Sequence, residues 1–195
     1  MIHQHLTILV VRHAESVPPT SGVGAESERD RPLTEHGLRD ADFLAESLVD
    51  MKPDKVFSSP YRRSIQTVSP LARKHGLSVE LIEDLRERLL SPDPLPDWKT
   101  QLKRCWDDFD YAPPGGETGK VAQARVLAVL EDLRIRYPAG LLVLGSHGNL
   151  ISLAIAAFAP EVGFEFWEAM PTPAVYRIEY GDSGWHVVAG PNFYF

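Results

Sequence analysis

The sequence predicts a three-layer α/β/α sandwich with a mostly parallel mixed sheet and a C-terminal edge hairpin. Two observations predict this class. Short apolar runs rich in β-branched residues alternate along the chain with segments whose apolar residues recur at helical spacing, as in α/β domains. Near the C-terminus the pattern changes to alternation around a Gly-Asp-Ser-Gly turn, which indicates an antiparallel hairpin.

Three apolar runs are predicted as the central strands. Residues 6–11 form a nearly unbroken run, which is typical of a strand covered on both faces. Residues 55–58 form a shorter run, and residues 141–145 repeat the character of the first. We expect these three strands to be parallel neighbours.

Four segments are predicted as helices, at residues 33–51, 64–75, 117–137 and 149–158. The first has apolar residues at helical spacing behind Thr34, which is its expected N-cap. The second contains Pro70, which is expected to kink it or divide it into two short pieces. The fourth is apolar nearly all round and is therefore expected to be buried.

The C-terminal region is predicted as an edge hairpin of residues 174–180 and 185–188, which makes the sheet mixed. The length of 195 residues fits one core, so residues 1–195 are predicted as a single domain. Residues 88–116 are rich in proline and include a candidate short helix at 97–109. We interpret them as a lid-like insertion.

Composition excludes several classes of function. With 20 Lys and Arg against 27 Asp and Glu, the net charge of −7 argues against nucleic acid or an anionic membrane as the main partner. The one cysteine, Cys105, excludes an intrachain disulfide and a cysteine-based zinc site. No basic leader and no apolar run near the ~20 residues of a membrane span is present. We expect a cytoplasmic protein without a cofactor; the sequence makes no prediction of its oligomeric state.

Basic side chains follow each of the three predicted central strands. Arg12 and His13 follow the first, Arg63 lies shortly after the second, and His147 follows the third. Ligands of α/β sheets bind at the carboxyl ends of the strands, so these groups are expected on one rim. Gathered cations repel one another unless an anion lies among them, and arginine matches two phosphate oxygens. The sequence therefore predicts a phosphate site, with Ser16 as a further phosphate-binding residue.

A histidine among arginines has a second consequence. Nearby positive charge disfavours the imidazolium form of His13 and leaves a ring nitrogen free as a nucleophile. Transfer of a phosphoryl group to it requires cations on the equatorial oxygens, which Arg12, Arg63 and His147 can supply. The leaving alkoxide requires a proton from a carboxylic acid, which sequence proximity alone does not select.

Five segments, in order, resemble the motifs of the histidine phosphatase superfamily, also called the phosphoglycerate mutase-like family. Arg12-His-Ala-Glu15 resembles its Arg-His-Gly-Glu signature and Leu33-Thr-Glu-His-Gly37 its Leu-Thr-x-x-Gly helix start. Residues 58–67 resemble its Ser-Ser-Pro-x-x-Arg-x-x-Gln-Thr segment, and Gly115–Thr118 and Ser146–Gly148 follow in the family order. The similarity covers nearly the whole chain and implies a phosphoglycerate mutase-like fold.

The resemblance also implies roles for individual residues. It makes His13 the phospho-accepting nucleophile, with Arg12, Arg63 and His147 as the phosphate pocket, and it favours Arg63 over its neighbour in the sequence, Arg62. Glu87 stands where the family carries its proton donor and is therefore the implied general acid. The implied activity is metal-independent hydrolysis of a small phosphorylated metabolite through a phosphohistidine intermediate.

The sequence departs from the family pattern in three places. Ala14 replaces the usual glycine, Pro18-Pro19 stands where mutases carry a phosphate-binding asparagine, and the Gly-x-Trp-x-Gly continuation after Glu87 is missing. Phosphatase is therefore favoured over mutase. Mutase-type phosphoryl transfer and a non-catalytic phosphate-binding or sensing module remain alternatives.

Two further patterns receive other interpretations. A metallohydrolase reading with His13 and His147 as ligands lacks the closely spaced His and Asp residues of such sites. The charged run at residues 25–31 is interpreted as a solvated loop that follows the nucleophile segment closely enough to border the pocket.

Overall fold

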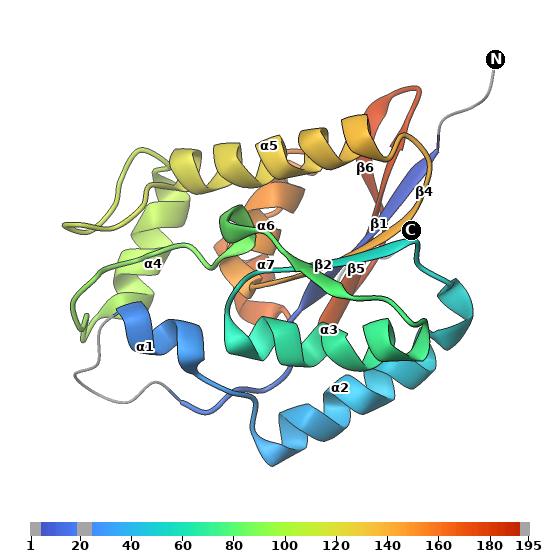
Figure 1. Ribbon diagram of the computed structural model, residues 1–195. Coiled ribbons are helices and arrows are strands. Elements are labelled where there is room, and N and C mark those ends of the chain that lie inside the picture. Colours follow the sequence, from blue (N-terminus) through green and yellow to red (C-terminus); the bar gives the residue numbers. More distant parts are fainter. Residues whose placement is uncertain (1–4, 19–24, 192–195) are drawn as a thin grey trace.

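The computed structural model describes residues 5–18 and 25–191, which form a six-stranded sheet between layers of helices (Figure 1). The strands are β1 (Leu6–Arg12), β2 (Lys55–Ser58), β3 (Val79–Leu81), β4 (Gly140–Ser146), β5 (Ala174–Gly181) and β6 (Gly184–Ala189). Their order is β3-β2-β4-β1-β5-β6. Strands β1 to β4 are parallel, whereas β5 and β6 are antiparallel at one edge. The predicted mixed sheet with a C-terminal edge hairpin is confirmed.

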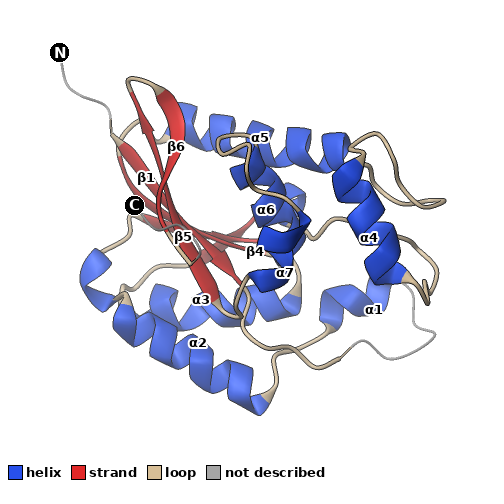
Figure 2. Ribbon diagram, turned by 180° about the vertical axis from the view of Figure 1, so that it is seen from behind, coloured by secondary structure: helices blue, strands red, loops and turns tan. Residues whose placement is uncertain are grey.

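Helices cover both faces of the sheet. They are α1 (Ala25–Asp30), α2 (Glu35–Ser47), α3 (Arg62–Lys74), α4 (Trp98–Asp107), α5 (Gly119–Arg136), α6 (Gly148–Ala156) and α7 (Phe164–Ala169). Helices α2 and α3 lie on one face, and α5 and α6 lie on the other (Figures 1 and 2). This is the predicted three-layer sandwich. Across the described residues, no helix combines the length and the apolar character that crossing a membrane requires.

The burial of β1 explains its unbroken apolar run. Leu6, Ile8 and Val10 belong to the core that packs against α5 and α6, whereas Leu9 and Val11 belong to the core beneath α2 and α3. Successive side chains of a strand point to opposite faces, so a strand covered on both sides must be apolar throughout.

Helix α3 differs from its prediction. It runs unbroken from Arg62 to Lys74 with Pro70 inside it. Pro70 is buried, and Val68 and Leu71 of the same helix pack in the core beneath α2 and α3. We attribute the continuity of the helix to this packing, which offsets the backbone hydrogen bond that proline cannot donate.

Three short elements were not predicted. Residues 25–31 were interpreted as a loop, but Ala25–Asp30 form α1, from which Arg29 reaches an ion pair with Glu83 at 2.8 Å. Strand β3 and helix α7 were likewise missed. Elements of three to six residues are too short to show a hydrophobic period in the sequence.

The insertion at residues 88–116 contains α4, close to the predicted short helix at 97–109. Helix α4 lies beside the N-terminal end of α5 (Figure 1). At the base of the insertion, buried Arg88 donates from Nε to the carbonyl of Glu117 at 2.8 Å, so the two ends of the segment are joined.

Candidate active site

The two motif histidines meet because of strand register. In the parallel pair of β1 and β4, Arg12 lies opposite Ser146, so His13 and His147 follow side by side. Their ring centroids are 5.2 Å apart in an edge-to-face arrangement. The N–H of His13 donates to the Ser146 carbonyl at 3.1 Å, which continues the pairing one residue beyond β1.

The loop that carries His13 is fixed by α3 and by the start of α2. The N–H of Ala14 donates to Thr67 Oγ1 at 3.0 Å, and Thr34 donates its N–H to the Glu15 carbonyl at 3.0 Å. A Cβ at Gly37 would lie 2.1 Å from the Glu15 carbonyl oxygen, so this position requires glycine. The Gln-Thr and Leu-Thr-x-x-Gly patterns thus position the nucleophile loop.

The imidazole of His13 has a defined orientation. Its Nδ1 lies 2.8 Å from the Ala14 carbonyl, which can only accept, so Nδ1 carries the proton. Arg63 Nε donates to His13 Nε2 at 3.2 Å. Burial, followed by the positive charge of Arg63, lowers the pKa of His13 to about 3. The ring is therefore neutral at physiological pH, with its lone pair on Nε2.

Arg63, and not Arg62, faces the histidine. The side chain of Arg63 is 2% exposed, whereas Arg62 is exposed to solvent. Arg63 Nη1 donates to the Glu28 carbonyl at 2.6 Å, and its guanidinium lies 4.9 Å from the centroid of the Tyr61 ring. Burial lowers the pKa of Arg63 to about 10, so it remains a cation at neutral pH.

Arg12 reaches the same region from the end of β1. Its Nη1 donates to the Met170 carbonyl, and its Nε has no hydrogen-bond partner among the described residues. The guanidinium lies over Gly148, where a Cβ would be 3.0 Å from Arg12 Nε. The absent side chain of Gly148 therefore gives Arg12 its place over the first turn of α6.

His147 is buried behind His13. Its Nε2 lies 2.8 Å from Ser59 Oγ, and its Nδ1 has no partner in the described part of the chain. Burial and the neighbouring charges of His13 and Arg63 lower the pKa of His147 well below the usual range. The second imidazole is therefore also neutral, with one ring nitrogen available.

Glu87 lies at the N-terminus of α6. Its Oε1 accepts from the N–H groups of Arg88 at 2.9 Å and Leu150 at 3.1 Å, and its Oε2 accepts from Asn149 at 3.3 Å. Free N–H groups at a helix N-terminus bind carboxylates because they carry the positive end of the helix dipole. This end of the helix fixes the predicted proton donor beside the site.

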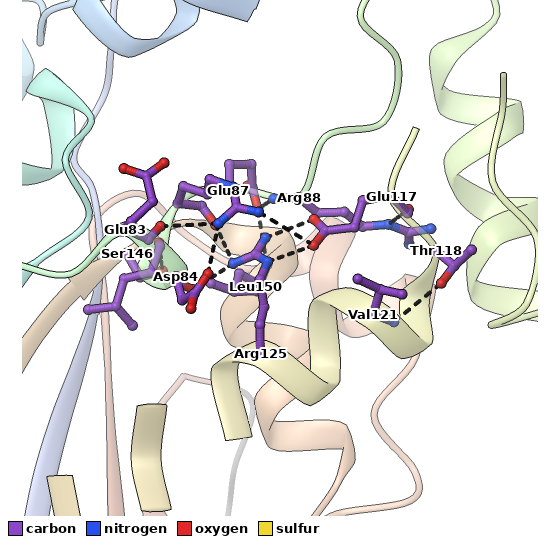
Figure 3. Close-up of polar contacts among 12 residues, drawn as sticks. Glu83, Asp84, Glu87, Arg88, Glu117, Thr118, Val121, Arg125, Ser146 and Leu150 are labelled. Carbon is purple, nitrogen blue, oxygen red and sulfur yellow. Dashed lines mark hydrogen bonds and ion pairs between the residues drawn. The ribbon is translucent and has the colours of Figure 1, made fainter. Parts of the chain in front are cut away.

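A buried ion pair supports the segment that leads to Glu87. Arg125, on α5, donates from Nε and Nη2 to the two carboxylate oxygens of Glu117 at 2.7 and 2.9 Å. Its Nη1 donates to the carbonyls of Asp84 at 2.6 Å and Arg86 at 3.0 Å (Figure 3). Sequence analysis marked Glu117 within a motif but did not identify Arg125, because a single arginine on a helix carries no pattern.

These side chains surround one cavity of about 500 Å³. It is lined by Arg12, His13, Glu15, Ser16, Glu28, Arg31, Arg63, Glu87, Trp98, Gly148, Trp167 and Thr172. All the predicted site residues except His147 belong to this lining, and His147 contacts it through the ring of His13. Pro18 is exposed, and Pro19 lies outside the described residues.

Several lining residues, among them Arg31, Trp98 and Trp167, were not predicted as catalytic or phosphate-binding residues. Arg31 Nη2 contacts Glu28 Oε2 at 2.9 Å and its Nη1 donates to the Val17 carbonyl at 3.0 Å. Trp98 and Trp167 lie on α4 and α7. The charged run that contains Arg31 was expected to border the pocket and the insertion that carries Trp98 was expected to form a lid, whereas Trp167 was not predicted near the site. The described residues contain no group of three His, Cys, Asp or Glu arranged to hold a metal ion.

The chain matches the family model of the histidine phosphatase superfamily, branch 1, over residues 8–192. It is 31% identical over 134 residues to the fructose-2,6-bisphosphatase TIGAR of Xenopus tropicalis, covering 65% of this chain and 49% of that protein. It is 28% identical over 169 residues to a glucosyl-3-phosphoglycerate phosphatase of Mycolicibacterium vanbaalenii, covering 77% and 72%. The chain thus spans about half the length of the frog protein.

Solved structures share the fold. YhfR of Bacillus stearothermophilus superposes with a TM-score of 0.77 at 23% identity, over 94% of this chain and 96% of that one. A mycobacterial glucosyl-3-phosphoglycerate phosphatase in complex with inorganic phosphate superposes with a TM-score of 0.75 at 23% identity, over 94% and 95%. The predicted fold class is confirmed by these likenesses.

Proposed function

Because this chain belongs to the histidine phosphatase superfamily, we propose that it hydrolyses phosphate monoesters, without a metal ion, through a phosphohistidine formed on His13. One observation carries the proposal. His13 is a neutral imidazole whose Nδ1 is held by the Ala14 carbonyl, while its Nε2 lone pair lies 3.2 Å from the guanidinium Nε of Arg63. The nucleophilic nitrogen and a phosphate-binding cation therefore lie next to each other.

In the first step, His13 Nε2 attacks the phosphorus atom of the bound ester. The N–P bond forms as the ester P–O bond breaks, and the leaving alkoxide takes a proton from the carboxylic acid of Glu87. His13 becomes cationic on phosphorylation, and the Ala14 carbonyl stabilises the remaining Nδ1–H.

In the second step, a water molecule attacks the phosphohistidine. The Glu87 carboxylate accepts the water proton, the P–N bond breaks, and inorganic phosphate leaves with His13 restored to its neutral form. The three backbone N–H groups that bind Glu87 hold its carboxyl group in position for this proton transfer.

The phosphate oxygens are bound by Arg12, Arg63 and His147 in this proposal. The Nε of Arg12 and the Nδ1 of His147 are buried polar atoms without partners among the described residues, as expected for atoms that bind a ligand. When Ser59 Oγ donates to His147 Nε2, the proton of the ring lies on Nδ1 and can be donated to a phosphate oxygen. Ser16 lines the same cavity and contributes a further polar group.

Two further points support this proposal. Both sequence relatives named above are phosphatases by name, although the chain covers only part of the frog protein. In residues 88–116, for which we propose a lid-like role, Trp98 lines the cavity and Lys99 forms an ion pair with Glu168 of α7. A small phosphorylated metabolite fits a cavity of this size.

The test is turnover of p-nitrophenyl phosphate by the wild type and the His13→Ala variant, each with and without EDTA. We expect the substitution to lower kcat by at least ~10⁴-fold, as loss of a catalytic nucleophile does. EDTA should leave the wild-type rate unchanged. His186→Ala, on the exposed hairpin, is the matched control and should retain full activity. Full activity of His13→Ala, or an EDTA effect that a divalent metal reverses, would contradict the mechanism.

A further inference from the structure

The outer part of the cavity is formed by two tryptophans that the proposed chemistry does not use. The indoles of Trp98 and Trp167 are 6.2 Å apart and nearly perpendicular, at 86°. Trp98 is 48% exposed, and among the exposed large apolar side chains of the described residues it alone lines the cavity. An exposed indole at the mouth of a site offers a face for ring stacking.

The two indoles are held in place by contacts between their helices. Lys99, next to Trp98, forms an ion pair with Glu168, next to Trp167. Lys103 Nζ lies 5.6 Å from the centroid of the Phe164 ring, which itself lies 5.5 Å from that of Trp167. These contacts join α4 to α7 on both sides of the indole pair, so the pair is a built part of the cavity.

The charges of the cavity disfavour a second anionic group on the substrate. Arg12 and Arg63 lie at the proposed phosphate position, and the third lining arginine, Arg31, is paired with Glu28 at 2.9 Å. The lining contains no lysine among the described residues, and the exposed carboxylate of Glu15 also belongs to it. A second phosphate or a carboxylate would therefore meet the carboxylates of Glu15 and Glu28, while the remaining lining arginine, Arg31, already shares Glu28 with Arg63.

We propose that Trp98 and Trp167 form a subsite for the leaving group, and that the substrates are monoesters of uncharged alcohols that carry a flat ring. The ring stacks on one indole and meets the edge of the other, since perpendicular aromatic pairs present both geometries to a third ring. This inference rests on the proposed function. The proposed subsite predicts that, among phosphate monoesters, bisphosphates and phosphoglycerates are poor substrates.

The kinetic test compares benzyl phosphate with n-hexyl phosphate. Both leave as primary alkoxides, so they differ chiefly in the ring. We expect the wild type to favour benzyl phosphate in kcat/KM by roughly tenfold, the size of a stacking contact removed by substitution. Trp98→Leu and Trp167→Leu should each abolish most of that preference, because kcat/KM should fall much more for benzyl phosphate than for hexyl phosphate. Phe43→Leu, an equally apolar change of an exposed ring on α2, should change neither.

A binding measurement separates the subsite from the chemistry. Calorimetric titration with benzylphosphonate and n-hexylphosphonate, which are not hydrolysed, should give tighter binding of the ring compound to the wild type and not to Trp98→Leu. Equal binding and equal turnover of the ring and chain compounds would overturn the subsite and leave phosphatase activity intact. Selective binding of benzylphosphonate without turnover of any monoester would support the subsite and overturn the proposed function. Preferred turnover of 3-phosphoglycerate over benzyl phosphate would also overturn the subsite.

Discussion

The cavity has an inner wall and an outer rim that are built in different ways. The inner wall, Arg12, His13, Arg63 and Glu87, lies at the carboxyl ends of strands and the first turns of helices, where backbone and side-chain hydrogen bonds fix each group. The outer rim, Trp98, Trp167 and Thr172, comes from α4, α7 and the segment after α7. Trp98 and Thr172 of this rim are exposed to solvent.

This difference separates the chemistry from the selection of substrates. Groups of the inner wall must keep fixed positions because misplacement by about 1 Å can lower a rate ~10²-fold. Groups of the outer rim need only offer a surface of the right shape and charge. We therefore expect inner-wall substitutions to affect every substrate by orders of magnitude, and outer-rim substitutions to act on selected substrates by about tenfold.

Substitution of the proton donor should have the largest effect and should depend on the leaving group. Glu87→Gln keeps the size of the side chain and an oxygen that can accept the N–H groups of Arg88 and Leu150, but it cannot supply a proton. We expect kcat for benzyl phosphate to fall by ~10²–10⁴-fold, the usual contribution of a general acid, and kcat for p-nitrophenyl phosphate to fall far less. Stopped assays with both esters measure this, and equal losses would remove Glu87 from the role of acid.

The two adjacent arginines provide the next test. Arg63→Lys keeps the charge but removes the planar fork and the Nε–H that lies against His13, so kcat/KM should fall by roughly 100-fold for ring and chain esters alike. Arg62→Lys, one residue away and exposed, should retain wild-type activity. Similar losses of kcat/KM in the two variants would contradict a specific role for Arg63 beside His13.

The histidine of the inner wall, His13, should make stability depend on pH. The pKa of His13 is about 3 in the native state and about 6.5 when unfolded, so below pH 6.5 only the unfolded chain binds this proton. The free energy of unfolding should therefore decrease as the pH is lowered. His13 should contribute about 2 kcal/mol of that decrease between pH 6.5 and pH 5. In the His13→Gln variant, the free energy of unfolding measured with urea should decrease by that much less over the same pH range. An equal decrease in the wild type and the variant would contradict a neutral His13.

Substitution of Arg125, which supports the inner wall from α5, should lower kcat by a smaller factor. Arg125→Lys keeps the charge but cannot bind both Glu117 oxygens and two carbonyls, so the segment before Glu87 should loosen and kcat for benzyl phosphate should fall about tenfold. Arg134→Lys changes a partly exposed arginine of the same helix, paired with Glu131 away from the cavity, and should have no effect. If Arg125 only stabilises the fold, p-nitrophenyl phosphate turnover will fall equally, and the positioning role fails.

Much of the fold could be predicted because its main elements are long and strongly patterned. The apolar runs of β1 and β4 and the periodic segments of α2 and α5 report burial directly. Strand β3, with three residues, shows no period and is defined only by its pairing with β2. The unbroken course of α3 through Pro70 depends on packing that local preference does not describe.

The site shows the same division. Arg12, His13 and Arg63 were predicted because they follow strands and lie in short motifs, so sequence position and spatial position coincide. Glu87 was implied only by the resemblance to the family. Arg31 and Trp98 were predicted only as part of segments near the pocket, and Arg125 was not predicted at all, because their contacts with the site depend on how α1, α4 and α5 pack around it. Residues that select a substrate therefore leave little trace in a single sequence.

The most direct test of the mechanism is to trap the covalent intermediate. Enzyme mixed with benzyl phosphate is quenched in alkali, in which phosphohistidine survives, and is then digested and analysed by mass spectrometry. We predict a phosphoryl group on the imidazole of His13 during turnover and none on the His13→Ala variant. Steady turnover in which no phosphoryl group ever occupies His13, or in which another residue carries it, would contradict the account.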